Sequence, residues 1–236
     1  MNDIYTIGIL AGMGPRSTAP FLESVLDECT SLYGAKFDDD FPHMMVYSLP
    51  TPFHPKKTLD DQKMIDALKI GIDALSNANC AIIAIPCNVV HLYYDQLCNM
   101  TQIPILNIIN ETIECLNPKP SKICVLGTRG TIESGLYQEQ LKRKNKTIFW
   151  SEGLQEKVDE LIFKIKNIGV CDEVISLWES IESIVIKEKV DEIICACTDL
   201  FFCSQYSQIK MYDSSQILAS SLVKTYIKEG LKEQYK

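Results

Sequence analysis

The chain has 236 residues, a net charge of -8 at pH 7, 46% apolar residues and 23% charged residues. This composition is ordinary for a folded globular protein and excludes a long disordered region. The acidic balance also argues against a nucleic-acid partner, because phosphate binding needs a clustered basic face. The dense basic run from Lys142 to Lys146 is predicted to be a solvated helix end.

The start of the chain and its cysteines indicate a cytoplasmic protein. The first residues carry no export signal, and no apolar run approaches the roughly 18 residues of a membrane span. In the cytoplasm the ten cysteines are expected to be reduced, and we expect neither a metal nor another cofactor. Several cysteines occur in apolar patterns and are predicted to be small core residues, namely Cys29, Cys80, Cys115 and Cys171.

The first half of the chain alternates between strand and helix patterns. Apolar runs predict strands over 4–10, 44–49, 80–85 and 105–109. Helical spacing predicts helices over 17–33, 60–77 and 111–116, and the segment 88–97 can also turn helical. Such alternation is typical of a parallel sheet with crossover helices.

A Pro-rich segment over 117–121 separates two similar halves. After it, strands are predicted over 123–126, 191–196 and 210–213, and helices over 134–144, 154–167, 172–187 and 199–205, with a loop at 127–131. We therefore predict an α/β protein with a first lobe over 1–117 and a second lobe over 118–214. The final helix, about 215–232, is expected to pack back on the first lobe.

The second half of the sequence repeats the first. A shift of 116 positions places Ile7 on Ile123, within an apolar strand in each half. A shift of 110 positions places Cys87 on Cys197, and each cysteine lies at the C-terminal end of an apolar strand. Because ligands bind outside the carboxyl ends of parallel strands, two facing lobes would bring both cysteines to one cleft.

Paired thiols suit the inversion of a stereocentre. One group must remove the Cα proton and another must deliver a proton from the opposite face, a demand that Cys87 and Cys197 meet if they face each other. A free thiol has a pKa of about 8.5, and a helix N-terminus lowers it. Each cysteine precedes a segment that can turn helical, so we expect a lowered pKa at both. Turn N–H groups and the side chains of Asn88 and Thr198 can supply donors for a substrate carboxylate.

Four motifs carry a resemblance to a known family. They are Ile7-Gly8-Ile9-Leu10-Ala11-Gly12-Met13-Gly14-Pro15, Cys87-Asn88-x-x-His91, Gly127-Thr128-Arg129-x-Thr131 and Cys197-Thr198-Asp199-Leu200. Together they resemble the aspartate/glutamate racemase family, and the third motif is similar to its broad-spectrum amino-acid racemase branch. The resemblance implies two pseudo-symmetric flavodoxin-like lobes with parallel sheets and an active-site cleft between them. It also implies catalysis without pyridoxal phosphate or metal, and a homodimer.

The resemblance further implies roles for individual residues. Cys87 and Cys197 would be the paired acid and base acting on a small amino-acid or dicarboxylate substrate. The implied substrate contacts are Met13, Lys56, Asn88, Val89, Thr128, Lys166 and Thr198.

Some positions depart from the family pattern. Val89 stands where the family usually has Thr, Ala196 replaces Gly, and Asp199 replaces Glu. Aspartate-specific members also place an Arg after the second strand to hold the side-chain carboxylate. In this chain Lys56 is the candidate for that charge, although a Lys point charge is not equivalent to an Arg fork.

The motifs disfavour some other functions and leave others open. A nicotinamide site is disfavoured because Pro15 removes a donor from the glycine loop and Ser17 stands at the third glycine position. His91 is expected to hydrogen-bond the backbone rather than serve as a base. The alternatives left open are cis-trans isomerisation or decarboxylation of a small dicarboxylic acid, and a non-catalytic homologue that binds amino acids.

Overall fold

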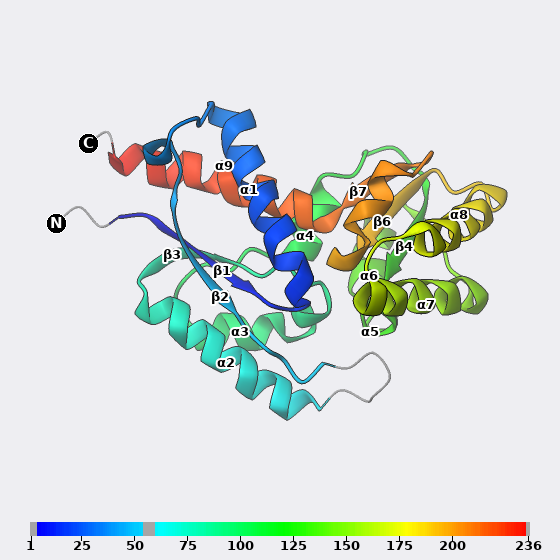
Figure 1. Ribbon diagram of the computed structural model, residues 1–236, viewed down its shortest axis with the longest axis horizontal. Coiled ribbons are helices and arrows are strands. Elements are labelled where there is room, and N and C mark those ends of the chain that lie inside the picture. The colour runs from blue at the N-terminus through cyan, green and yellow to red at the C-terminus, as the bar shows by residue number, and fades with distance from the viewer. Residues whose placement is uncertain (1–3, 54–59, 235–236) are drawn as a thin grey trace.

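Two parallel sheets with helices packed around them make up the computed structural model, which describes residues 4–53 and 60–234 (Figure 1). The elements of the first half are β1 (Thr6–Ala11), η1 (Pro15–Ser17), α1 (Thr18–Tyr33), η2 (Asp38–Asp40), β2 (His43–Ser48), α2 (Asp61–Asn77), β3 (Cys80–Ala84), η3 (Val89–Tyr93), α3 (Tyr94–Met100) and α4 (Ile108–Glu114). Those of the second half are β4 (Lys122–Gly127), α5 (Arg129–Glu133), α6 (Leu136–Arg143), β5 (Thr147–Phe149), α7 (Glu152–Ile168), α8 (Asp172–Lys187), β6 (Glu192–Ala196), η4 (Thr198–Gln205), β7 (Lys210–Asp213) and α9 (Ser214–Gln234). Over the described ranges, no helix is long and apolar enough to cross a membrane.

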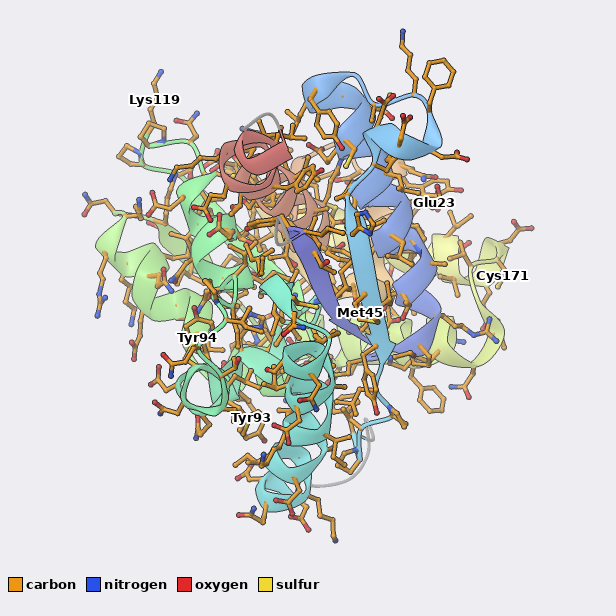
Figure 2. All side chains as sticks on the ribbon, turned by 90° about the vertical axis from the view of Figure 1, so that its left-hand side faces the viewer. Glu23, Met45, Tyr93, Tyr94, Lys119 and Cys171 are labelled. Carbon is orange, nitrogen blue, oxygen red and sulfur yellow. The ribbon has the colours of Figure 1, made fainter. Side chains whose placement is uncertain are left out.

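The first sheet has the strand order β2-β1-β3, and all of its strands are parallel. The central strand β1 alternates its side chains between the two faces. Ile7 and Ile9 face a cluster that includes residues of α1, α4 and α9, whereas Leu10 faces a cluster that includes residues of α2. Figure 1 shows α1 and α9 on one side of this sheet and α2 and α3 on the other. β2 is an edge strand, and its Met45 lies at the front of Figure 2 with nearly half of its surface exposed.

The strand predicted over 105–109 is wrong, because only an isolated bridge between Ile83 and Ile105 forms there. Asn107 ends the extended segment: its side-chain oxygen accepts hydrogen bonds from the backbone N–H groups of Ile109 and Asn110. Asn is favoured at this N-cap position because its side chain satisfies N–H groups that the first helical turn leaves free. The segment therefore enters α4 three residues earlier than the sequence predicted.

The second sheet has the strand order β5-β4-β6-β7 and is also parallel. Its order repeats that of the first sheet, with β4, β5 and β6 in the places of β1, β2 and β3. The prediction of an α/β fold with two pseudo-symmetric lobes and parallel sheets is confirmed. The short edge strand β5 was not predicted, because Thr147 to Phe149 directly follows a basic run and is only three residues long.

The loop predicted over 127–131 is largely helical. Thr128 caps α5, accepting a hydrogen bond from the backbone N–H of Thr131, so the helix begins at Arg129. Gly135 then interrupts the helical path with a left-handed φ of 75°, and α6 starts directly after it. Glycine adopts this conformation without the steric cost of a Cβ atom. The helix predicted over 134–144 forms as α6, two residues later at its start, and α5 is an additional helix that the sequence did not predict.

The final helix, α9, packs against α1 and α4 (Figure 1). The apolar cluster around it contains β1 residues of the first sheet, such as Ile7, together with β4 residues of the second sheet, such as Ile123. A continuous core therefore joins the two halves through α4 and α9. The division of the chain at residues 117 and 118 stays a prediction.

The predictions for individual cysteines were partly wrong. Cys29 and Cys80 are buried core residues, as predicted, but Cys115 is exposed and Cys171 is only half-buried. Cys115 follows the last residue of α4, and Cys171 precedes α8 and lies at the periphery of the molecule in Figure 2. Both lie at helix ends, where an apolar pattern in the sequence does not by itself imply burial.

The basic run Lys142 to Lys146 is not solvated throughout, because the side chain of Lys146 is only 1% exposed. Its ammonium group donates to the carbonyl oxygens of Asn117 and Lys119, each at 2.6 Å, and to the Ser121 hydroxyl at 2.9 Å. It also lies 3.6 Å from the buried Glu192 carboxylate. Lys146 therefore links the Pro-rich segment to the second sheet through hydrogen bonds and an ion pair.

We predict that Lys146→Met lowers the free energy of unfolding by about 3 kcal/mol, because it removes three buried hydrogen bonds and leaves Glu192 with only the exposed Lys210 ammonium 3.8 Å away. The matched control is Lys144→Met, which removes a Lys from the half-exposed ion pair with Glu114 and should cost less than about 1 kcal/mol. Urea unfolding of both variants measures the difference. Equal costs would show that the buried ammonium group does not stabilise this junction.

Candidate active site

A cavity of about 690 Å³ lies at the carboxyl ends of the strands of both sheets. Its walls come from the loop after β1, the segment after β2, the β3–η3 junction, the start of α5, the last turn of α7 and the β6–η4 junction. The residues that line it are Gly12, Met13, Gly14, Pro15, Arg16, Ser48, Pro50, Thr51, Phe53, Met64, Cys87, Asn88, Val89, Val90, Thr128, Thr131, Ile165, Lys166, Ala196, Cys197, Thr198 and Asp199.

All but one of the predicted site residues line this cavity. They are Met13, Cys87, Asn88, Val89, Thr128, Lys166, Cys197 and Thr198. Lys56 lies outside the described residues. Segments far apart in the sequence are therefore brought together at the carboxyl edges of the two sheets, where parallel α/β proteins bind their ligands.

Cys87 follows β3 and is 9% exposed. Burial raises the pKa of its thiol to about 11, against the opposing effect of the Val90 backbone N–H, which points toward the sulfur. The nearby Asp199 carboxylate raises the pKa further and the Lys166 ammonium lowers it. The expectation of a lowered thiol pKa is wrong, because desolvation in the cavity wall outweighs the N–H groups of the turn.

Cys197 occupies the corresponding place after β6 and is 8% exposed. Its thiol donates a hydrogen bond to Asp199 Oδ2 over 3.8 Å. Burial and the Asp199 carboxylate both raise the pKa of Cys197, and the Lys166 ammonium again opposes them. The negative charge of Cys87, when ionised, raises it further. The two thiols therefore share one electrostatic environment and affect each other.

Lys166 and Asp199 form an ion pair of 2.6 Å inside the cavity wall. The Asp199 side chain is 7% exposed and that of Lys166 26%. The glycine loop after β1 lies close to this pair, since a Cβ atom at Gly14 would be 3.0 Å from Lys166 Nζ. A Lys from α7, a carboxylate from η4 and a glycine from the first half thus meet beside the two thiols.

The polar side chains of the cavity wall bond to segments outside their own turns. Tyr137 donates its hydroxyl to Asn88 Oδ1 at 2.7 Å, and Asn88 Nδ2 donates to Ser214 Oγ at 2.9 Å. Thr198 Oγ1 donates to Ser17 Oγ at 3.1 Å. These bonds join Asn88 to α6 and α9, and Thr198 to the short helix η1 that follows the glycine loop.

His91 bonds to the backbone, as predicted. Its Nε2 accepts a hydrogen bond from the Ile108 N–H at 3.2 Å, so Nδ1 carries the proton and donates to the Cys87 carbonyl at 2.9 Å. Burial lowers the pKa of His91, which keeps the imidazole neutral. His91 therefore holds the backbone of the cysteine turn in place.

Sequence reasoning missed part of the cavity wall. Arg16, on the short helix after the glycine loop, brings a second positive charge to the site. An apolar wall comes from three separate segments, with Phe53 after β2, Met64 in α2 and Ile165 in α7. The position of Arg16 beside the glycine loop could have indicated it, but nothing local in the sequence marks the three apolar residues. Within the ranges 4–53 and 60–234, no group of three or more His, Cys, Asp or Glu side chains is placed to hold a metal ion.

Known proteins resemble this chain in both sequence and structure. The broad specificity amino-acid racemase RacX of Bacillus subtilis is 41% identical over 223 residues, which cover 94% of this chain and 98% of that protein. Picrophilus torridus aspartate racemase superposes with a TM-score of 0.78 at 25% identity, over 94% of each chain. Glutamate racemase from Francisella tularensis, in complex with D-glutamate, shares the fold with a TM-score of 0.69 at 14% identity, over 98% of this chain and 84% of that one.

The sequence profile of the Asp/Glu/Hydantoin racemase family matches residues 10–222. This match covers all four motifs except the first three residues of the glycine-loop string. The family resemblance predicted from those motifs is confirmed. The chain belongs to the Asp/Glu/Hydantoin racemase family.

Proposed function

We propose that this chain is an amino-acid racemase that works without pyridoxal phosphate. Cys87 and Cys197 exchange the Cα proton from opposite faces of the substrate. The observation that carries the proposal is that both thiols line one cavity, each from the carboxyl end of an equivalent strand. The similarity to a broad specificity amino-acid racemase over nearly the whole chain supports it.

The proposed reaction balances protons between the two sulfurs. The thiolate of one cysteine takes the Cα proton and becomes a thiol, while the thiol of the other gives its proton to the opposite face of the same carbon and becomes a thiolate. Asn88, Thr128 and Thr198, with the backbone N–H groups of their turns, are the proposed donors to the substrate carboxylate. Met13, Val89 and Lys166 complete the proposed contacts, together with Lys56 from outside the described residues.

Because both thiols have a high pKa, other charges in the cavity must stabilise the thiolate that the reaction needs. Cys87 is the easier thiol to ionise, since the Asp199 carboxylate bonds directly to Cys197 and not to Cys87. The α-ammonium group of an amino acid adds a positive charge to the cavity, and a nearby positive charge lowers the pKa of a thiol. Substrate binding therefore favours the thiolate when the α-ammonium lies nearer the sulfur than the α-carboxylate does.

Racemisation is favoured over the other reactions of this superfamily because two thiols are present. A decarboxylase can manage with a single thiol, whereas inversion of a stereocentre needs one group on each face. The apolar wall of Phe53, Met64 and Ile165 supports neutral side chains as well as acidic ones among the substrates.

We also propose that the protein acts in the cytoplasm as a homodimer of two-lobed subunits divided near residues 117 and 118. All ten cysteines are free thiols, which supports a reducing compartment. The homodimer rests on the family resemblance alone.

Exchange of the Cα proton with solvent is the first test. Incubation in D2O with L-alanine, L-methionine, L-aspartate, L-glutamate and L-lysine should incorporate deuterium at Cα of at least one of them, measured by proton NMR. Exchange with none of a wider panel, while calorimetry detects binding, would instead support the non-catalytic homologue.

Each cysteine is tested by serine substitution. Cys87→Ser and Cys197→Ser should each lower the rate of racemisation by about 100-fold or more, because a serine hydroxyl is a far weaker acid than a thiol and its alkoxide is not populated near neutral pH. Cys98→Ser changes an exposed cysteine outside the cavity and should leave the rate unchanged. Polarimetry or chiral chromatography measures the rates. Retention of most activity in either of the first two variants would rule out the two-base scheme.

The charge of Asp199 is tested by Asp199→Asn. Asp199 raises the pKa of both thiols, so its removal lowers the pKa and increases the thiolate fraction at a given pH. Alkylation of Cys87 and Cys197 by iodoacetamide at about pH 8 should become at least about threefold faster, followed by mass spectrometry of their peptides. Asp73→Asn breaks a matched ion pair with Lys69 on the surface and should change neither rate. Slower alkylation in Asp199→Asn would contradict the assigned role.

A further inference from the structure

Tyr137 is a fully buried residue of α6 that bonds to the cavity wall without belonging to it. Its hydroxyl donates to Asn88 Oδ1 at 2.7 Å. Asn88, which lines the cavity directly after Cys87, is itself only 2% exposed. A tyrosine from the second half thus reaches the residue next to a proposed catalytic thiol of the first half.

The side-chain amide of Asn88 forms one hydrogen bond through its oxygen and one through its nitrogen. Its oxygen accepts from Tyr137, and its nitrogen uses one N–H to donate to Ser214 Oγ. An amide nitrogen carries two N–H groups, so one remains for a ligand in the cavity that Asn88 lines. Both hydroxyls can donate or accept; in the structure Tyr137 donates to the amide oxygen and Ser214 accepts from the amide nitrogen. The bond to Tyr137 holds the amide oxygen, so the nitrogen keeps its remaining N–H for the ligand.

We infer that Tyr137 is a positioning residue for substrate binding, which holds the Asn88 amide with an N–H group available to the substrate carboxylate. The inference rests on the proposed function and deepens it. Tyr137 does not line the cavity, and its hydroxyl is linked to the cavity wall through its bond to Asn88. Because Asn88, Tyr137 and Ser214 belong to three segments separated by up to 126 positions, the same bonds also join the Cys87 turn to α6 and α9.

The test is a double-mutant cycle of Tyr137→Phe and Asn88→Ala, read by calorimetric binding of the five amino acids named above. Tyr137→Phe keeps the ring but removes the donor, so the dissociation constant of each amino acid that binds should rise about tenfold. In the Asn88→Ala background the same substitution should change the dissociation constant by less than about twofold, since the residue through which it acts is gone. In active preparations KM should rise more than kcat falls.

Tyr212→Phe is the matched control. Tyr212 is also buried, and its hydroxyl donates to Glu192 at 2.9 Å and accepts from the Asn117 N–H at 3.1 Å, away from the cavity. Both variants should unfold at a lower urea concentration, because each substitution removes a hydrogen bond from a buried polar group. Only Tyr137→Phe should also weaken binding.

Two outcomes would overturn the inference. Unchanged binding in Tyr137→Phe would assign the tyrosine to folding alone, and an equal loss in both backgrounds would mean that it does not act through Asn88. If the wild-type protein binds amino acids but exchanges no Cα proton, the proposed racemase activity is contradicted, whereas the role of Tyr137 in binding can still be tested. If the wild-type protein binds none of the amino acids, both the proposed function and the role of Tyr137 are contradicted.

Discussion

Hydrogen bonds between the two halves of the chain hold the cavity walls together. Ser17 and Thr198 join the glycine loop to the Cys197 turn, and Asn88 and Tyr137 join the Cys87 turn to α6. Each of these side chains is buried, where a hydrogen bond to another protein group replaces water and an unmade bond is costly. These bonds fix the turns that carry the two thiols, so the proposed chemistry depends on them.

A buried site with two thiols has an electrostatic conflict. In the proposed reaction burial would protect a carbanion from water, but burial also raises the pKa of the thiol proposed as the base. The ion pair of Lys166 and Asp199 places opposite charges beside both sulfurs, one lowering and one raising the thiol pKa. Buried ion pairs add little to stability on balance, because desolvation offsets their attraction. Their placement here fits control of thiol ionisation better than support of the fold.

The sequence predicted the features that depend on local patterns. Strand and helix periodicity, the repeat and the turns after the strands placed Cys87 and Cys197 at equivalent positions of two parallel sheets. It could not predict partners from distant segments, such as Tyr137 for Asn88, or the burial of Lys146 under the Pro-rich segment. The thiol pKa was mispredicted for the same reason, since desolvation depends on the whole cavity wall rather than on the turn.

A crystal structure of the protein with an amino-acid substrate in the cavity tests the central claim most directly. The account predicts that the Sγ atoms of Cys87 and Cys197 lie on opposite faces of the substrate Cα, each at about 3.5 Å, with the carboxylate on the donors of the Asn88 and Thr198 turns. A substrate with both sulfurs on one face, or with one sulfur turned away from the Cα, would contradict it.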